Sequence, residues 1–100
     1  MKIIYEVMAV VDPTLGDRFE DFMAERHLSA MMATGFFLSA TLTRSVDRFL
    51  MRYTVIDRAT FDRYLAGPGE DLRADTLKHF PTGVRFDREV WHVIAEYNSV

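Results

Sequence analysis

The sequence contains no cysteine, which excludes disulfide bridges, thiolate metal sites and a cysteine nucleophile. It also lacks internal repeats and low-complexity segments. No apolar stretch reaches the roughly 20 residues that a membrane-spanning helix needs. The apolar start of the chain is interrupted by Glu6, and no small-residue cleavage site follows, so it predicts a strand rather than a signal peptide. We therefore expect a cytoplasmic protein that does not enter a membrane.

The composition is that of an ordinary globular domain. Of the 100 residues, 49% are hydrophobic and 27% are charged, which predicts one folded domain over residues 1–100. The net charge of −3 argues against broad nucleic-acid binding, and we expect no nucleic-acid partner. A chain of this size can bury a core and still gain stability by oligomerisation.

Two strand-like segments, residues 3–11 and 49–56, are apolar on both faces. An antiparallel sheet with one face in water should instead alternate between apolar and polar side chains. One layer of helices covers only one face of a sheet. We therefore expect a second copy of the chain to cover the other face, giving a homodimer through the sheet.

The order of the predicted elements is β-α-β-β-α-β, which is the ferredoxin-like pattern of an α+β fold. Asp12-Pro13 and Asp57 begin the two helical regions, and Gly67-Pro68-Gly69 breaks the second. Because Arg26 and His27 disturb the apolar stripe of the first helix and Ser29 could cap a new turn, we expect a bend or break around residues 26–29. The predicted strands span residues 3–11, 36–44, 48–56 and 84–95, and the predicted helices span residues 13–33, 58–66 and 70–80.

Several short motifs, in this order along the chain, resemble an uncharacterised bacterial family. They are IIYEV at residues 3–7, HLSAMMATG at 27–35, RYL at 63–65, LR at 72–73 and HF at 79–80. The family is a domain of unknown function in the dimeric α+β barrel superfamily, which is ferredoxin-like and includes antibiotic-biosynthesis monooxygenases. His27 matches the family pattern, whereas Leu28 and Ser29 stand where Ile-Pro is usual.

The resemblance implies a fold, a dimer and a cavity between the sheet and its helices, but no particular activity. The superfamily includes cofactor-independent monooxygenases, haem-degrading enzymes, lactone isomerases and stress-responsive dimers. Since one fold supports many functions, this implies only a small hydrophobic or aromatic ligand.

His27 is the candidate acid or base. It lies near the end of an amphipathic helix, at the edge of the apolar stripe, from which it could project into a cavity. The alternative is a histidine that interacts with the helix dipole and hydrogen-bonds a carbonyl group. A catalytic role predicts a pocket beside His27 that admits a ligand of several heavy atoms.

Tyr5, Arg52 and Tyr53 are the candidate ligand-binding residues. A tyrosine hydroxyl or a guanidinium among apolar side chains could orient an oxyanion or carboxylate. Tyrosines more often supply packing area, and Arg52 could equally pair with Glu6 across strands or across a dimer. Asp75 and Arg73 are predicted to lie on a solvated helix face.

No metal site and no cofactor are predicted. The three histidines, His27, His79 and His92, do not follow a metal-ligand spacing. Each could in principle bind a haem iron, but nothing in their spacing favours this. Trp91 is expected in core or interface packing.

Two functions of different classes therefore remain. One is a dimeric small-ligand enzyme or binding protein with His27 as a proton shuttle, and the other is a non-catalytic structural or interaction dimer. An RNA-recognition module shares the element order, but the third strand lacks the glycine of that module's signature. The enzyme status stays open, as do the ligand and any assembly above a dimer.

Overall fold

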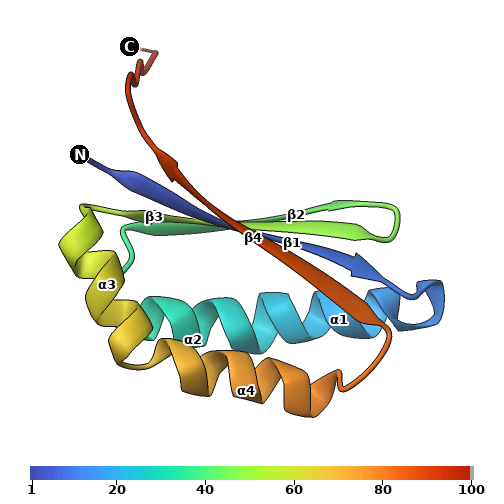
Figure 1. Cartoon of the computed structure of the whole chain (residues 1–100). Coiled ribbons are helices and arrows are strands. Elements are labelled where there is room, and N and C mark those ends of the chain that lie inside the picture. The colour runs from blue at the N-terminus through green and yellow to red at the C-terminus, as the bar shows by residue number, and fades with distance from the viewer. Residues whose placement is uncertain (100) are drawn as a thin grey trace.

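The computed structural model describes residues 1–99, so residue 100 of the predicted domain lies outside the described residues. Four strands and a series of helical segments make up the fold (Figure 1). The strands are β1 (Ile3–Val11), β2 (Ser39–Ser45), β3 (Arg48–Val55) and β4 (Val84–His92). The helical segments are η1 (Pro13–Leu15), α1 (Gly16–Phe22), η2 (Met23–His27), α2 (Leu28–Ala33), α3 (Arg58–Ala66) and α4 (Gly69–His79).

The strands form one antiparallel sheet in the order β2-β3-β1-β4. All helices lie on one side of this sheet and leave its other face bare (Figure 1). The predicted ferredoxin-like α+β fold is therefore confirmed. Among residues 1–99, no helix is long and apolar enough to cross a bilayer.

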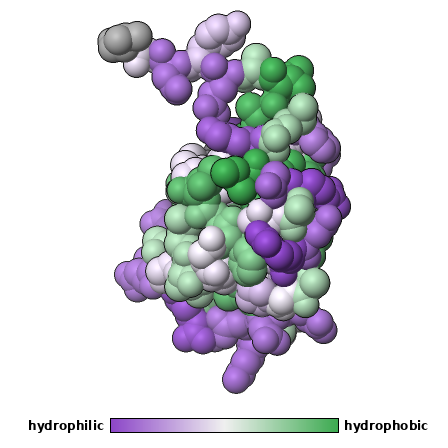
Figure 2. Space-filling view, turned by 90° about the vertical axis from the view of Figure 1, so that its left-hand side faces the viewer, coloured by the Kyte–Doolittle hydropathy of each residue, from purple (hydrophilic) through white to green (hydrophobic). Residues whose placement is uncertain are grey.

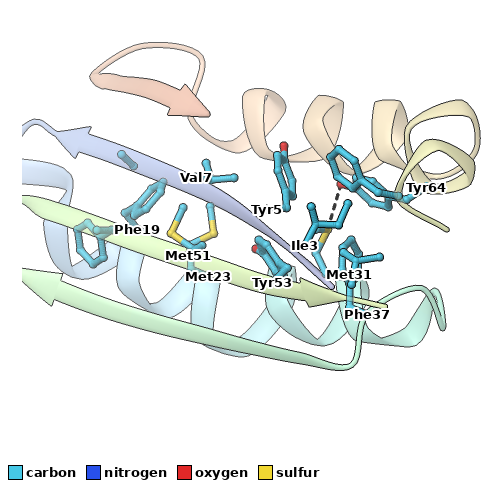
Figure 3. Packing of buried hydrophobic residues seen from close by; sticks show 14 of the residues in the cluster. Ile3, Tyr5, Val7, Phe19, Met23, Met31, Phe37, Met51, Tyr53 and Tyr64 are labelled. Carbon is cyan, nitrogen blue, oxygen red and sulfur yellow. Dashed lines mark hydrogen bonds between the residues drawn. The ribbon is translucent and has the colours of Figure 1, made fainter. Parts of the chain in front are cut away.

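The core lies between the inner face of the sheet and the helices (Figure 3). Cross-strand neighbours on this face are Tyr5 with Tyr53 and Val7 with Met51, all of them buried. Phe19, Met23 and Met31 project from the first helical region onto these side chains. On β1 the inward-facing set consists of Ile3, Tyr5, Val7, Ala9 and Val11.

The first helical region runs without a break from Gly16 to Ala33 and contains a π-turn, η2. The predicted break around residues 26–29 is absent, but the regular α-helix is interrupted here by the π-turn, which ends at His27 before α2 begins at Leu28. Ser29 does not cap a new helix, because its hydroxyl donates instead to the carbonyl of Arg26 at 3.0 Å. The expected end near residue 33 is confirmed, and Gly35 follows with a φ of +80°.

The π-turn explains how residues spaced four apart all face the sheet. Phe19, Met23, His27 and Met31 have this spacing. In a regular α-helix each such step turns the side chain by about 40°, so three steps would turn it by about 120°. The extra residue of a π-turn removes about 100° of that rotation. His27 is therefore brought to the same side as Met23 and Met31.

Two strand ends differ from the predictions. β2 begins at Ser39 rather than at residue 36, and Phe37 is buried while Leu38 is exposed. The alternation of buried and exposed side chains in residues 36–38 is therefore out of step with that of β2. β4 ends at His92 rather than near residue 95, because His92 already pairs with Ile3, the first residue of β1.

The outer face of the sheet is half-exposed, and no segment within residues 1–99 covers it (Figure 1). Along β1 and β3 it presents Ile4, Met8 and Leu50 around an ion pair in which Glu6 and Arg52 lie 3.2 Å apart. Polar side chains border this stripe on β2. Figure 2 shows hydrophobic surface on the sheet side of the molecule and a mostly hydrophilic helix side.

Candidate functional site

A small cavity lies between the inner face of the sheet and the helices. Its walls combine aromatic, methionine, basic and hydroxyl side chains, namely Tyr5, Val7, Met23, His27, Met31, Met51, Tyr53, Tyr64, Arg73, Thr76, Phe86 and Arg88. The volume of about 20 Å³ is enough for about one water molecule. A pocket beside His27 is present, but it is smaller than the predicted pocket for several heavy atoms.

His27 is fixed in the cavity wall by a contact with the neighbouring helix. Its Nδ1 lies 3.2 Å from the hydroxyl oxygen of Thr76 on α4, and its ring stacks against Phe22. Burial lowers the pKa of His27 to about 4; the charge of Asp75 raises this pKa by less than burial lowers it, and the charge of Arg88 lowers it slightly further. The imidazole is therefore neutral near pH 7.

The Thr76 hydroxyl also constrains the position of the imidazole proton. It lies 3.3 Å from the carbonyl oxygen of Leu72, which can only accept a hydrogen bond. When Thr76 donates to that carbonyl, its oxygen accepts the Nδ1 proton of His27. In that tautomer the Nε2 atom has a free lone pair and can accept a proton from a bound molecule.

Three tyrosines form the aromatic part of the site. The rings of Tyr5 and Tyr53 have centroids 5.9 Å apart, and those of Tyr5 and Tyr64 are 6.1 Å apart. The Tyr64 hydroxyl donates to the sulfur of Met31 at 3.3 Å (Figure 3). Burial raises the pKa of Tyr53 and raises that of Tyr64 to about 12, so both remain protonated and can donate hydrogen bonds.

The structure brings together three of the four predicted site residues. His27, Tyr5 and Tyr53 all line the cavity. Arg52 lies on the outer face of the sheet and contacts Glu6, which is the alternative arrangement that the sequence left open. It does not reach the cavity, because neighbouring residues of a strand point to opposite faces.

Arg73, Arg88, Tyr64 and Thr76 also line the cavity, and the sequence did not single them out as site residues. The prediction of a solvated helix face is wrong for Arg73, which is half-buried beside the cavity. For Arg88 a signal existed, since it alternates in phase with Phe86 and Val90 on β4. That phase places it on the inner face of the sheet.

The other histidines lie outside the cavity. His79 donates from Nδ1 to the carbonyl of Asp75 at 2.8 Å, and His92 is exposed at the end of β4. Within the described part of the chain, no three histidine, aspartate or glutamate side chains gather closely enough to bind a metal ion. Trp91, predicted in core or interface packing, is 47% exposed.

Fold and cavity together define a ferredoxin-like α+β protein with a polar-edged aromatic cavity between its sheet and helices. Residues 2–94 match a family described as a domain of unknown function (DUF4286). The chain belongs to this family, as the sequence motifs predicted. No curated protein matches the chain.

Solved structures of similar fold span almost the whole chain. A variant of SnoaB, a cofactor-independent oxygenase from Streptomyces nogalater, is 18% identical with a TM-score of 0.74, over 98% of both chains. A dimeric ferredoxin-like protein from an uncultured marine organism is 21% identical with a TM-score of 0.72, over 96% of this chain and 98% of the other. The haem degrader MhuD from Mycobacterium tuberculosis is 17% identical with a TM-score of 0.72, over 96% of this chain and 99% of the other. At these identities the likeness establishes the fold alone.

Proposed function

We propose that the chain binds a small aromatic or hydrophobic molecule in the cavity beside His27, and that His27 exchanges a proton with it. The observation that supports this most directly is a neutral imidazole held by Thr76 at 3.2 Å within a wall of tyrosines and methionines. Such a mixture of apolar surface and a few convergent polar groups is typical of ligand pockets. The fold of an oxygenase and of a haem degrader is compatible with such a pocket.

Ligand entry requires the cavity to expand from its present 20 Å³. Met23, Met31 and Met51 line it, and methionine side chains adapt to new shapes because they are unbranched and have three rotatable bonds. Arg88 is exposed, so it can move at little cost. The methionine positions thus provide the adaptable wall and the tyrosines the fixed one.

A thermal-shift screen of small aromatic compounds tests this proposal. We expect some compounds to stabilise the wild type and none of them to stabilise His27→Ala, while the variant itself remains folded. His92→Ala is the matched control, because His92 is an exposed histidine outside the cavity. A screen without any stabilising compound, or equal stabilisation of both variants, would contradict the proposal and favour the non-catalytic dimer.

The second part of the proposal is that two copies associate through their outer sheet faces. Ile4, Met8 and Leu50 form a half-exposed apolar stripe there, with polar residues at its borders. An apolar centre with a polar rim is the usual anatomy of a protein interface. A fold neighbour described as a dimeric ferredoxin-like protein is consistent with this arrangement.

A further inference from the structure

Two arginines at the cavity reach it from different elements. Arg88 is on β4, directly opposite Val7 of β1, and therefore projects from the inner face of the sheet. Arg73 is on α4, one helical turn before Thr76, which contacts His27. The two guanidinium groups thus belong to the same wall that holds the candidate acid or base.

These arginines have no acidic partner among residues 1–99. Other arginines do: Arg26 donates to Asp75 at 2.8 Å, and Arg44 donates to Asp17 at 3.0 Å. No carboxylate of the described chain lies within 4.0 Å of Arg73 or Arg88. The carboxylates beside Arg88 in sequence point to the other face of the sheet, since neighbouring strand residues alternate.

The local charge is therefore opposite to that of the whole molecule. The chain has a net charge of −3, but the residues that line the cavity include two arginines and no aspartate or glutamate. Both positive charges act on the Tyr64 hydroxyl, whose pKa burial raises and these arginines lower. Because His27 is neutral there, Arg73 and Arg88 are the charged side chains among the lining residues, while Asp75 outside the lining acts on His27 more strongly than Arg88 does.

We propose that the ligand of this cavity is an aromatic carboxylate, with its carboxylate bound by Arg73 and Arg88 and its ring packed against the tyrosines. The inference rests on the ligand-binding function proposed above and narrows it to one chemical class. A planar guanidinium binds a carboxylate through two parallel hydrogen bonds, which an amide of the same shape does not reproduce. The ligand carboxylate then supplies a counter-ion for the half-buried Arg73 and the exposed Arg88, neither of which has an acidic partner among residues 1–99.

The experiment compares three probes by NMR titration: benzoate, the isosteric neutral benzamide, and acetate, which lacks the ring. For the wild type we expect benzoate to bind about tenfold or more tightly than either of the other two, as the loss of a charge-assisted hydrogen bond predicts. Arg73→Gln and Arg88→Gln should each weaken benzoate binding about tenfold or more. Arg85→Gln is the matched control, because Arg85 is exposed on the outer face of the same strand and should bind benzoate like the wild type.

The outcomes separate the two proposals. Equal binding of benzoate and benzamide, lost in His27→Ala, would leave the ligand site intact and overturn carboxylate recognition. Acetate binding equal to that of benzoate would overturn the aromatic part of the inference. If neither aromatic probe binds at millimolar concentration, both proposals are wrong for ligands of this class. Should a glutamine variant fail to fold, Arg73→Lys and Arg88→Lys keep the charge but lose the bidentate geometry, and weaker benzoate binding is again expected.

Discussion

His27 couples protonation to folding because its pKa is about 4 in the folded chain and about 6.5 when it is exposed. A lowered histidine pKa means that the unfolded chain takes up the proton first. Stability from this residue is therefore complete above pH 6.5 and declines as the pH falls to about 4, below which both states are protonated. The total loss should be at most about 3 kcal/mol.

Urea unfolding of the wild type and of His27→Gln, at pH 7 and at pH 4.5, measures this loss. The variant should show a smaller decrease in unfolding free energy over this interval, because it has no imidazole to titrate. Carboxylates with lowered pKa values, such as Asp12 and Asp57, lose their contribution at lower pH and are present in both proteins. Equal decreases in the two proteins would show that His27 is not held neutral by the fold.

Individual site residues could be predicted from the sequence only on strands, where the alternation of side chains tells which residues share a face. Tyr5 and Tyr53 share the phase of the buried residues of β1 and β3, and they line the cavity, while their role in ligand binding stays a prediction. Arg52 alternates with these residues and lies on the outer face of the sheet. Arg88 lies on the inner face, because it is opposite Val7. Thr76 could not be found in this way, since its contact with His27 depends on how two helices pack.

The turn between β2 and β3 contains a strained residue. Val46 has a φ of +55°, a conformation that a β-branched side chain rarely adopts. Its side chain is 79% exposed and so has little packing to lose. We expect Val46→Gly to stabilise the protein by about 1 kcal/mol, which corresponds to a rise in Tm of about 4 to 8 °C.

Thermal unfolding by circular dichroism measures this rise. Ser45→Gly is the control, because Ser45 is a strand residue with no positive φ, and its replacement by glycine should lower the Tm. A lower Tm for Val46→Gly would mean that the strain is smaller than the entropy that glycine loses on folding.

The π-turn η2 makes a second prediction at the scale of elements. Deleting Ala24, an exposed residue of this turn, should convert η2 into ordinary α-helix and keep Phe19 and Met31 on the face of the sheet. Deleting Ala74 from the regular helix α4 should instead rotate Thr76 and Phe80 by about 100° out of the core. Circular dichroism and thermal melts should show a cooperative fold for the first variant and a large loss of stability for the second.

The sequence indicated that something interrupts the first helix, but it did not specify a π-turn. Polar Arg26 and His27 disturb the apolar stripe, and a disturbed stripe is compatible with a break, a bend or an extra residue in one turn. The side chains that face the sheet from Phe19 to Met31 are spaced four apart, and in a regular helix this spacing would turn them gradually away from the sheet. This pattern therefore favours an extra residue in one turn.

For the whole molecule, the bare outer face predicts association. We expect light scattering to give the mass of a dimer at micromolar concentration. Leu50→Glu should produce a monomer, because it places a charge within the apolar stripe, opposite Met8. Leu77→Glu is the control, because Leu77 is an exposed leucine of α4 on the helix side, and this variant should leave the dimer intact. A wild-type monomer, or a dimer unaffected by Leu50→Glu, would contradict the proposed interface.

The overall architecture was more predictable than the cavity. Alternating apolar residues and capping residues such as Asp57 are local signals, and they fixed the order of the strands and helices along the chain. Cavity volume depends instead on how side chains from seven elements, three strands and four helical segments, fill the space between them. A change in the rotamer of one methionine moves several atoms into or out of that space, and no local sequence pattern predicts the rotamer.

The place of β1 in the centre of the sheet has a consequence for how the protein acquires its structure. β1 pairs with β4, whose residues are roughly eighty positions later in the sequence, so the fold depends on contacts of high sequence separation. During synthesis one edge of β1 stays without a partner until β4 has been made. Chains halted before that point would present an open apolar strand to one another, which makes them the species most prone to aggregate.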